Sequence, residues 1–168
     1  TSAFSIAMQA GDGVRLQAVS ELTGFESTLP APFDKKREAP LPLRVDLDLS
    51  DASDLAFTYG DVLTGYAARK VEGWSGIARI GGGALDNASV RAKALASNTL
   101  EVGGRLSELD LLAWSDVITQ FELSGTESGF NAQWQALEID RVQLGAGDLL
   151  GVKTSGRSNS RGLDVELV

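Results

Sequence analysis

The side chains that could do chemistry in this chain are mainly carboxylates, because the usual nucleophiles and general bases are missing. The 168 residues contain no His and no Cys. This excludes Ser-His-Asp triads, thiolate nucleophiles, zinc–thiolate sites and imidazole metal sites. Any catalysis would therefore depend on carboxylates, lysine, tyrosine or serine.

The densest carboxylate group consists of Asp46, Asp48, Asp51 and Asp54. Alternate residues of a strand point to the same side, so Asp46 and Asp48 would project together, about 7 Å apart. Such a pair could serve a glycosidase or a Ca²⁺ site. The calcium-loop pattern fails, because Asp51 stands where that loop needs glycine and Phe57 stands where it needs glutamate. We interpret the cluster as the solvated outer face of a strand and expect no enzymatic activity.

Two glycine-containing motifs have superficial likenesses to catalytic loops. In Gly73-Trp74-Ser75-Gly76, Ile77 occupies the position where a nucleophile elbow needs glycine, and no His could act as its base. Gly81-Gly82-Gly83 lacks the Gly-Lys-Ser/Thr ending of a phosphate-binding loop. The second motif is interpreted as a turn or bulge after a strand.

Charge and aromatic content narrow the possible partners. The chain has 15 Lys+Arg against 23 Asp+Glu, a net charge of −8, so nucleic acid is not expected to bind. The basic run Lys35-Lys36-Arg37 is shorter than the about four to eight residues of a polybasic membrane anchor. It is interpreted as a solvated loop. Trp74, Trp114 and Trp134 are far apart in the sequence, which favours core or edge packing over a sugar-stacking platform.

Period-two alternation predicts the strands that must position these residues. In the clearest segment one side would carry apolar residues and the other charged ones, namely Leu43, Val45, Leu47 and Leu49 against Arg44, Asp46 and Asp48. The same alternation recurs in Leu55, Phe57 and Tyr59; in Val90, Ala92, Ala94 and Ala96; in Leu100, Val102, Gly104 and Leu106; in Leu137 and Ile139; and in Leu163, Val165 and Leu167.

Turn signals separate these runs, and two segments break the pattern. Hairpin turns are predicted at residues 11–13, 59–61, 96–98, 145–148 and 158–160. The two prolines of Leu29–Phe33 exclude a central strand there. Asp110 is expected to cap a short helix that ends at Ile118 and carries Leu111, Trp114 and Ile118 on one face. Beyond this helix, Phe121 and Leu123 are expected to be extended.

The fold class that follows is mostly β, an antiparallel meander forming a twisted, curved open sheet or groove with one short α-helix. We expect a single section over residues 1–168. Within it, residues 1–118 form the main sheet and helix, 119–131 a linker and 132–168 a closing meander. No run approaches the about 18 apolar residues of a membrane span. The start at Thr1 without an initiator Met leads us to expect an excised section of a longer protein.

Several stretches carry a resemblance to a known family. Leu22-Thr23-Gly24 is followed by Leu29-Pro30-Ala31-Pro32-Phe33-Asp34-Lys35, an L-x-G step and an LPAP-x-x-K connection before an alternating strand. Gly81–Gly83 leads through Leu100–Leu106 to Leu109–Trp114, a G-x-L-x-x-L-D-L-x-x-W step from strand to helix. In these motifs the chain resembles the AsmA-like superfamily of Gram-negative envelope proteins, and within it the YhdP-type proteins.

The resemblance implies a long antiparallel sheet curled into an open, β-taco-like groove with an apolar interior. It implies a section near the C-terminal part of a protein that an N-terminal helix anchors in the inner membrane and that crosses the periplasm. Such proteins are implicated in moving phospholipid between the membranes and in keeping the outer membrane a barrier. The implied partners are phospholipid acyl chains, neighbouring β-sections of the parent chain and membrane-proximal envelope proteins. No catalytic residue, metal or cofactor is implied.

Three functions remain in competition at this point. The first is a lipid conduit, in which the apolar side of the strands lines a groove. The second is a closed β-sandwich binding module of carbohydrate-binding or adhesin-like type, with a dry core. The third, a glycosidase using Asp46 to Asp54, is disfavoured because alternation exposes both candidate carboxylates. The residues expected to line the groove are Leu43, Val45, Leu47, Leu49, Phe57, Tyr59, Leu100, Val102 and Leu106.

Overall fold

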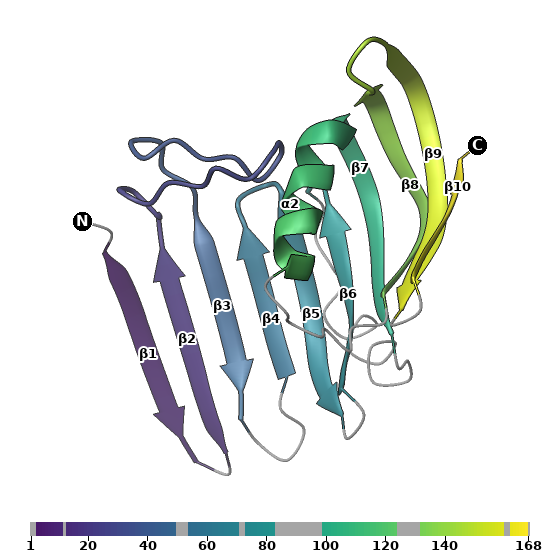
Figure 1. Ribbon diagram of the computed structural model, residues 1–168. Coiled ribbons are helices and arrows are strands. Elements are labelled where there is room, and N and C mark those ends of the chain that lie inside the picture. The colour runs from purple at the N-terminus through teal and green to yellow at the C-terminus, as the bar shows by residue number, and fades with distance from the viewer. Residues whose placement is uncertain are drawn as a thin grey trace.

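The computed structural model describes residues 3–11, 13–49, 54–70, 73–82, 99–123, 132–159 and 162–167. They form one ten-stranded sheet whose strands lie side by side in chain order, with the two termini at opposite edges (Figure 1). The elements are β1 (Phe4–Ala10), β2 (Val14–Ser20), β3 (Leu43–Asp48), β4 (Asp54–Tyr59), β5 (Leu63–Lys70), β6 (Gly73–Ile80), β7 (Leu100–Asp110), α2 (Leu111–Leu123), β8 (Ala132–Gln143), β9 (Asp148–Asn159) and β10 (Gly162–Leu167).

This architecture confirms the predicted fold class of an open, mostly β sheet with a short helix. β1 and β10 occupy the two edges and do not pair with each other, so the sheet does not close. Within the described residues every strand belongs to this single sheet. The closed β-sandwich expected under the second hypothesis is therefore wrong, because a sandwich needs two sheets packed face to face.

Two junctions of the sheet depart from the predicted antiparallel meander. β1 to β6 pair antiparallel, as do β8 to β10, but β7 runs parallel to both β6 and β8. Parallel neighbours need a long crossover connection instead of a tight turn. Helix α2 lies in the crossover between β7 and β8, in front of the sheet (Figure 1). Residues 81–99 separate β6 from β7. The strand predicted from Val90 to Ala96 and the turn predicted at 96–98 lie outside the described residues.

Three of the other tight turns lie where the sequence predicts them. β1 and β2 pair across residues 11–13, β4 and β5 across residues 60–62, and β8 and β9 across residues 144–147. The turn predicted at 158–160 is placed too early, because Ser158 and Asn159 still belong to β9 and pair with Leu163 and Gly162 of β10. The proline-containing segment 29–33 lies in a long connection between β2 and β3, outside the sheet, as expected.

Helix α2 begins where the sequence places it but ends later. One carboxylate oxygen of Asp110, Oδ1, accepts hydrogen bonds from the backbone amides of Leu112 and Ala113, both at 3.0 Å, and so caps the first turn. The helix continues to Leu123, so the expectation that Phe121 and Leu123 are extended was wrong. No glycine or proline interrupts residues 119–123, which form the first part of the predicted linker. The remainder of that linker, 124–131, lies outside the described residues.

Two small clusters of buried residues replace a single large core. The first joins Tyr66, Ala68 and Ile77, with Ala56 packed against them, on β4 to β6. The second lies on β7 to β9 and contains Leu106, Ile139, Val142 and Val152, packed against by Ile80, Leu109 and Leu137. Most of the apolar surface of β1 to β3 belongs to neither cluster.

Candidate functional site

Apolar side chains form continuous rows across the sheet. Because a strand directs alternate side chains to opposite sides, residues paired in the register share a side. One row runs through Ile6, Ala18, Val45, Phe57, Gly65, Ala78 and Val102. Beside it runs Met8, Leu16, Leu47, Leu55, Ala67, Gly76 and Leu100. We call this side of β1 to β7 the apolar face and its opposite side the polar face.

The structure places the predicted lining residues on this face but in different surroundings. Seven of them are partly buried, namely Leu43, Val45, Leu47, Phe57, Tyr59, Leu100 and Val102. Leu49 follows the end of β3 and is exposed. Leu106 differs, because it is only 6% exposed and packs in the cluster of Ile139, Val142 and Val152. Sequence alternation missed Ile6 and Met8, which are 72% and 71% exposed on the edge strand β1.

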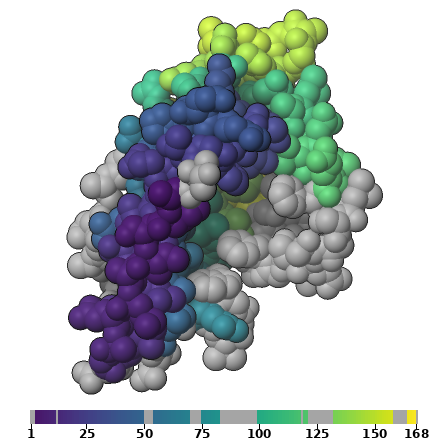
Figure 2. Space-filling view, turned by 90° about the vertical axis from the view of Figure 1, so that its left-hand side faces the viewer, coloured from purple at the N-terminus to yellow at the C-terminus, as the bar shows by residue number. Residues whose placement is uncertain are grey.

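The connection between β2 and β3, residues 21–42, crosses one end of the apolar face. Phe33 stacks on Tyr59, with 6.4 Å between ring centroids, and meets Trp114 of α2 edge to face at 5.8 Å. The indole Nε1 of Trp114 donates a hydrogen bond of 3.1 Å to the carbonyl oxygen of Ala31. These contacts tie the connection to the helix on the side to which Tyr59 points. Figure 2, seen from the β1 edge, shows the connection projecting from the upper end of the sheet toward α2.

Burial also changes the acidity of the Tyr59 phenol. The pKa of the Tyr59 phenol is raised, first by burial and then by the negative charge of Asp34. The phenol therefore stays neutral at physiological pH. A neutral ring at this end of the face is compatible with apolar neighbours.

The prediction that Lys35 is solvated, like the rest of its basic run, is wrong. Its side chain is buried, and Nζ donates hydrogen bonds to the carbonyl oxygens of Phe25, at 2.8 Å, and Lys36, at 3.0 Å. Lys36 and Arg37 are exposed, as expected. The lysine of the LPAP-x-x-K motif thus fastens the loop that presents Phe33. No local sequence signal separates Lys35 from Lys36 and Arg37, since its burial depends on a contact with Phe25, ten residues earlier.

The polar face carries an ordered network of charges. Arg15 Nε lies 3.0 Å from Asp48 Oδ2, while Asp46 accepts hydrogen bonds from Gln17 Nε2 at 2.6 Å and from Arg44 Nε at 2.7 Å. The bond from Arg44 lowers the pKa of the Asp46 carboxyl, although partial burial opposes the shift. These pairs give the acidic segment a structural role on the polar face.

One member of the carboxylate group is not solvated. Asp54 is only 8% exposed and accepts a 2.6 Å hydrogen bond from the phenol of Tyr66. The prediction of a solvated cluster was wrong here, because β4 places Asp54 beside the buried group on β5 and β6. Asp51 lies outside the described residues. The described part of the chain contains no group of acidic side chains that could hold a metal ion.

The remaining motifs have structural explanations. Ser75 is almost completely buried within β6, which does not suit a nucleophile. Gly81 and Gly82 follow β6 with positive φ angles, as expected of a turn or bulge after a strand, and Gly83 lies outside the described residues. The indole Nε1 of Trp134 donates to Thr154 Oγ1 at 3.3 Å, so Trp114 and Trp134 pack in different places. The side chain of Trp74 lies outside the described part.

Comparison with known proteins identifies the family. Residues 2–167 match the family described as YhdP protein, and no curated protein and no solved structure matches the chain. Among the described residues, no helix is long and apolar enough to cross a membrane. The match covers nearly the whole chain, including the LPAP-x-x-K connection and the strand-to-helix step that carried the resemblance. The chain belongs to the YhdP family.

Proposed function

We propose that this chain is a section of an inner-membrane-anchored, periplasm-spanning protein, and that its apolar face conducts phospholipid between the inner and outer membranes. By this activity it would support the barrier function of the outer membrane. The observation that carries the proposal is the continuity of the apolar rows from β1 to β7, which no second sheet covers in the described part. Membership of the YhdP family supports it.

The physical basis is burial of acyl chains without chemical reaction. Covering apolar surface is favourable by about 25 cal/mol per Å², and each methylene of an acyl chain that leaves water gains about 0.8 kcal/mol. Neighbouring strands repeat at about 4.8 Å, so an acyl chain that moves across the strands exchanges one set of apolar contacts for a similar set. The barrier to sliding is then low. Acyl chains and the neighbouring β-sections of the parent chain are the proposed partners.

Replacing Val45 by Asp tests the proposal. Val45 lies in the middle of an apolar row, between Ala18 and Phe57 in the register. An unpaired carboxylate there would have to be desolvated whenever an acyl chain passes, which costs several kcal/mol. We expect phospholipid transfer to the outer membrane, measured by pulse labelling in cells that carry the full-length protein, to fall at least about tenfold.

Val19→Asp is the matched control. Val19 lies on the adjacent strand, on the polar face, 38% exposed and paired in the register with Arg44. This variant should fold and transfer lipid at the normal rate. Native mass spectrometry should find phospholipid co-purifying with the Val19→Asp chain and not with Val45→Asp. Unchanged transfer in a well-folded Val45→Asp variant would count against the proposal.

A further inference from the structure

A single charged residue lies on the apolar face of β1 to β6 among the residues that the structure describes. β5 pairs with β6 without interruption, from Leu63 opposite Ile80 to Lys70 opposite Gly73. Alternation along this regular strand places Arg69 on the side of Leu63, Gly65 and Ala67. The other charged residues of these strands, such as Arg44 and Asp46, lie on the polar face.

Arg69 is exposed and has no carboxylate partner in the part of the chain described. Most other described arginines are paired, namely Arg15 with Asp48, Arg37 with Glu26, Arg44 with Asp46, Arg105 with Asp140, Arg141 with Glu108 and Arg157 with Asp164. Arg79 likewise has no carboxylate partner among the described residues. It pairs with Thr64 in the register and therefore lies on the polar face. Arg69 is thus an available cation at the border of an uncharged surface.

A guanidinium at this position suits a phosphate group. Arginine is weakly hydrated and binds phosphate oxygens through two parallel hydrogen bonds. A net charge of −8 repels free anions, so an anion that binds here needs additional apolar contacts. A phospholipid supplies both parts, an anionic phosphodiester and acyl chains.

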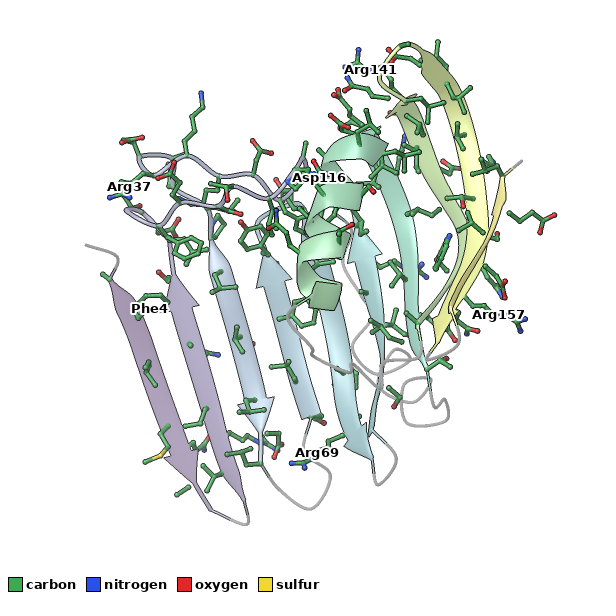
Figure 3. All side chains as sticks on the ribbon, viewed as in Figure 1. Phe4, Arg37, Arg69, Asp116, Arg141 and Arg157 are labelled. Atoms are coloured by element: carbon green, nitrogen blue, oxygen red, sulfur yellow. The ribbon has the colours of Figure 1, made fainter. Side chains whose placement is uncertain are left out.

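The dimensions of β5 agree with this ligand. Arg69 lies near the lower end of β5 (Figure 3). Tyr59, on which Phe33 stacks, pairs with Leu63 at the other end of this strand. At about 3.4 Å per residue, the strand from Arg69 to Leu63 spans about 20 Å. The hydrocarbon layer of one membrane leaflet is about 15 Å thick, half of the bilayer core. Acyl chains attached to a phosphate at Arg69 would therefore lie within the length of the apolar face.

We propose that Arg69 binds the phosphodiester group of a phospholipid whose acyl chains lie against the apolar face. The inference rests on the proposed lipid transport and adds to it a headgroup contact at the ends of the strands. Phosphate recognition would hold each lipid in one orientation, with its headgroup at the rim and its chains inside. It would leave the identity of the alcohol beyond the phosphate unselected.

The test compares Arg69→Gln with Arg79→Gln. Both substitutions remove one exposed, unpaired positive charge from adjacent strands, but on opposite faces. Binding to the full chain is followed by NMR titration with three probes, which are monomeric dihexanoylphosphatidylethanolamine, dihexanoylglycerol and inorganic phosphate. For Arg69→Gln we expect about tenfold weaker binding of the phospholipid and unchanged binding of dihexanoylglycerol. Arg79→Gln should bind both lipids normally, and inorganic phosphate should not compete with either.

Each contrary outcome has a distinct meaning. Equal losses in both variants would overturn the inference, because they would show a general effect of net charge. Unchanged phospholipid binding by Arg69→Gln would also overturn it, while leaving the apolar face as a lipid site. Tight binding of inorganic phosphate at Arg69 would identify a free-anion site and overturn the lipid assignment. If the unmodified chain binds neither lipid, the proposed function fails and the inference fails with it.

Discussion

Replacement of Lys35 by Met is expected to lower the free energy of unfolding by about 2 kcal/mol. Methionine fills a similar volume but cannot donate, so the carbonyl oxygens of Phe25 and Lys36 lose the hydrogen bonds that Nζ now makes. The Phe25 carbonyl loses its hydrogen bond from Nζ at a part-buried position, whereas the Lys36 carbonyl keeps the one from the Ala39 amide, so most of the loss comes from the Phe25 contact. Urea unfolding followed by circular dichroism should show the change, with a melting temperature about 5 °C lower.

Lys36→Met provides the control for this experiment. Lys36 is the adjacent residue, carries the same charge and is exposed. Its substitution should change stability by no more than about 0.5 kcal/mol. Equal destabilisation by the two variants would mean that the loss comes from charge or from the unfolded state. The hydrogen bonds of Lys35 Nζ would then not be what fastens the loop.

Loss of the Lys35 hydrogen bonds would also affect the apolar face, because the same loop carries Phe33. Phe33, two residues before Lys35, fills the space between Tyr59 and Trp114. A loop that loses its buried lysine holds this ring less firmly, and the contact between the loop and α2 weakens with it. Lys35 thus positions the aromatic contacts at one end of the proposed lipid path, although its own side chain does not lie there.

The apolar face could be predicted from the sequence because its signal is local. Leu43, Val45 and Leu47 alternate with charged residues, and the direction of each side chain follows from its position in the strand. β5 and β6 gave no such signal. Small residues, such as Gly65, Ala67 and Ala68, carry little hydrophobic contrast between the two sides. Arg69 was missed for this reason, since its side of the sheet is known only once the register of β5 is known.

The burial of Lys35 and Asp54 could not be predicted from sequence, because it depends on partners distant along the chain. Lys35 is buried only because the loop folds back so that the carbonyl of Phe25 meets its Nζ. Asp54 is buried because Tyr66, on the next strand, supplies a donor. Sequence patterns alone treat a charged residue as solvated, which is correct unless such partners converge. The parallel strands were missed for a related reason, since pairing across a crossover leaves no local pattern.

The second large effect concerns Gly104, at the junction between the antiparallel and parallel parts of the sheet. Its φ of +121° is one that side-chain-bearing residues rarely adopt, and a Cβ atom there would overlap the backbone carbonyl of Ile80 on β6. The register of β7 with β8 shifts between Val102 and Arg105, around this glycine. Gly104→Ala is therefore expected to destabilise the fold by about 3 kcal/mol, measured by urea unfolding.

Gly147→Ala separates this local clash from a general effect of replacing glycine. Gly147 lies in the turn between β8 and β9, and an added Cβ would meet no atom within 4 Å. That variant should keep its stability within about 0.5 kcal/mol. Equal loss in both variants would contradict the assignment of strain to Gly104. With the expected result, the pairing of Ile80 with residue 104, at the end of the β6–β7 ladder, requires a residue without a Cβ atom. It then also fixes where the apolar face passes from Val102, which is partly buried, to Leu106, which is enclosed in the cluster on β7 to β9.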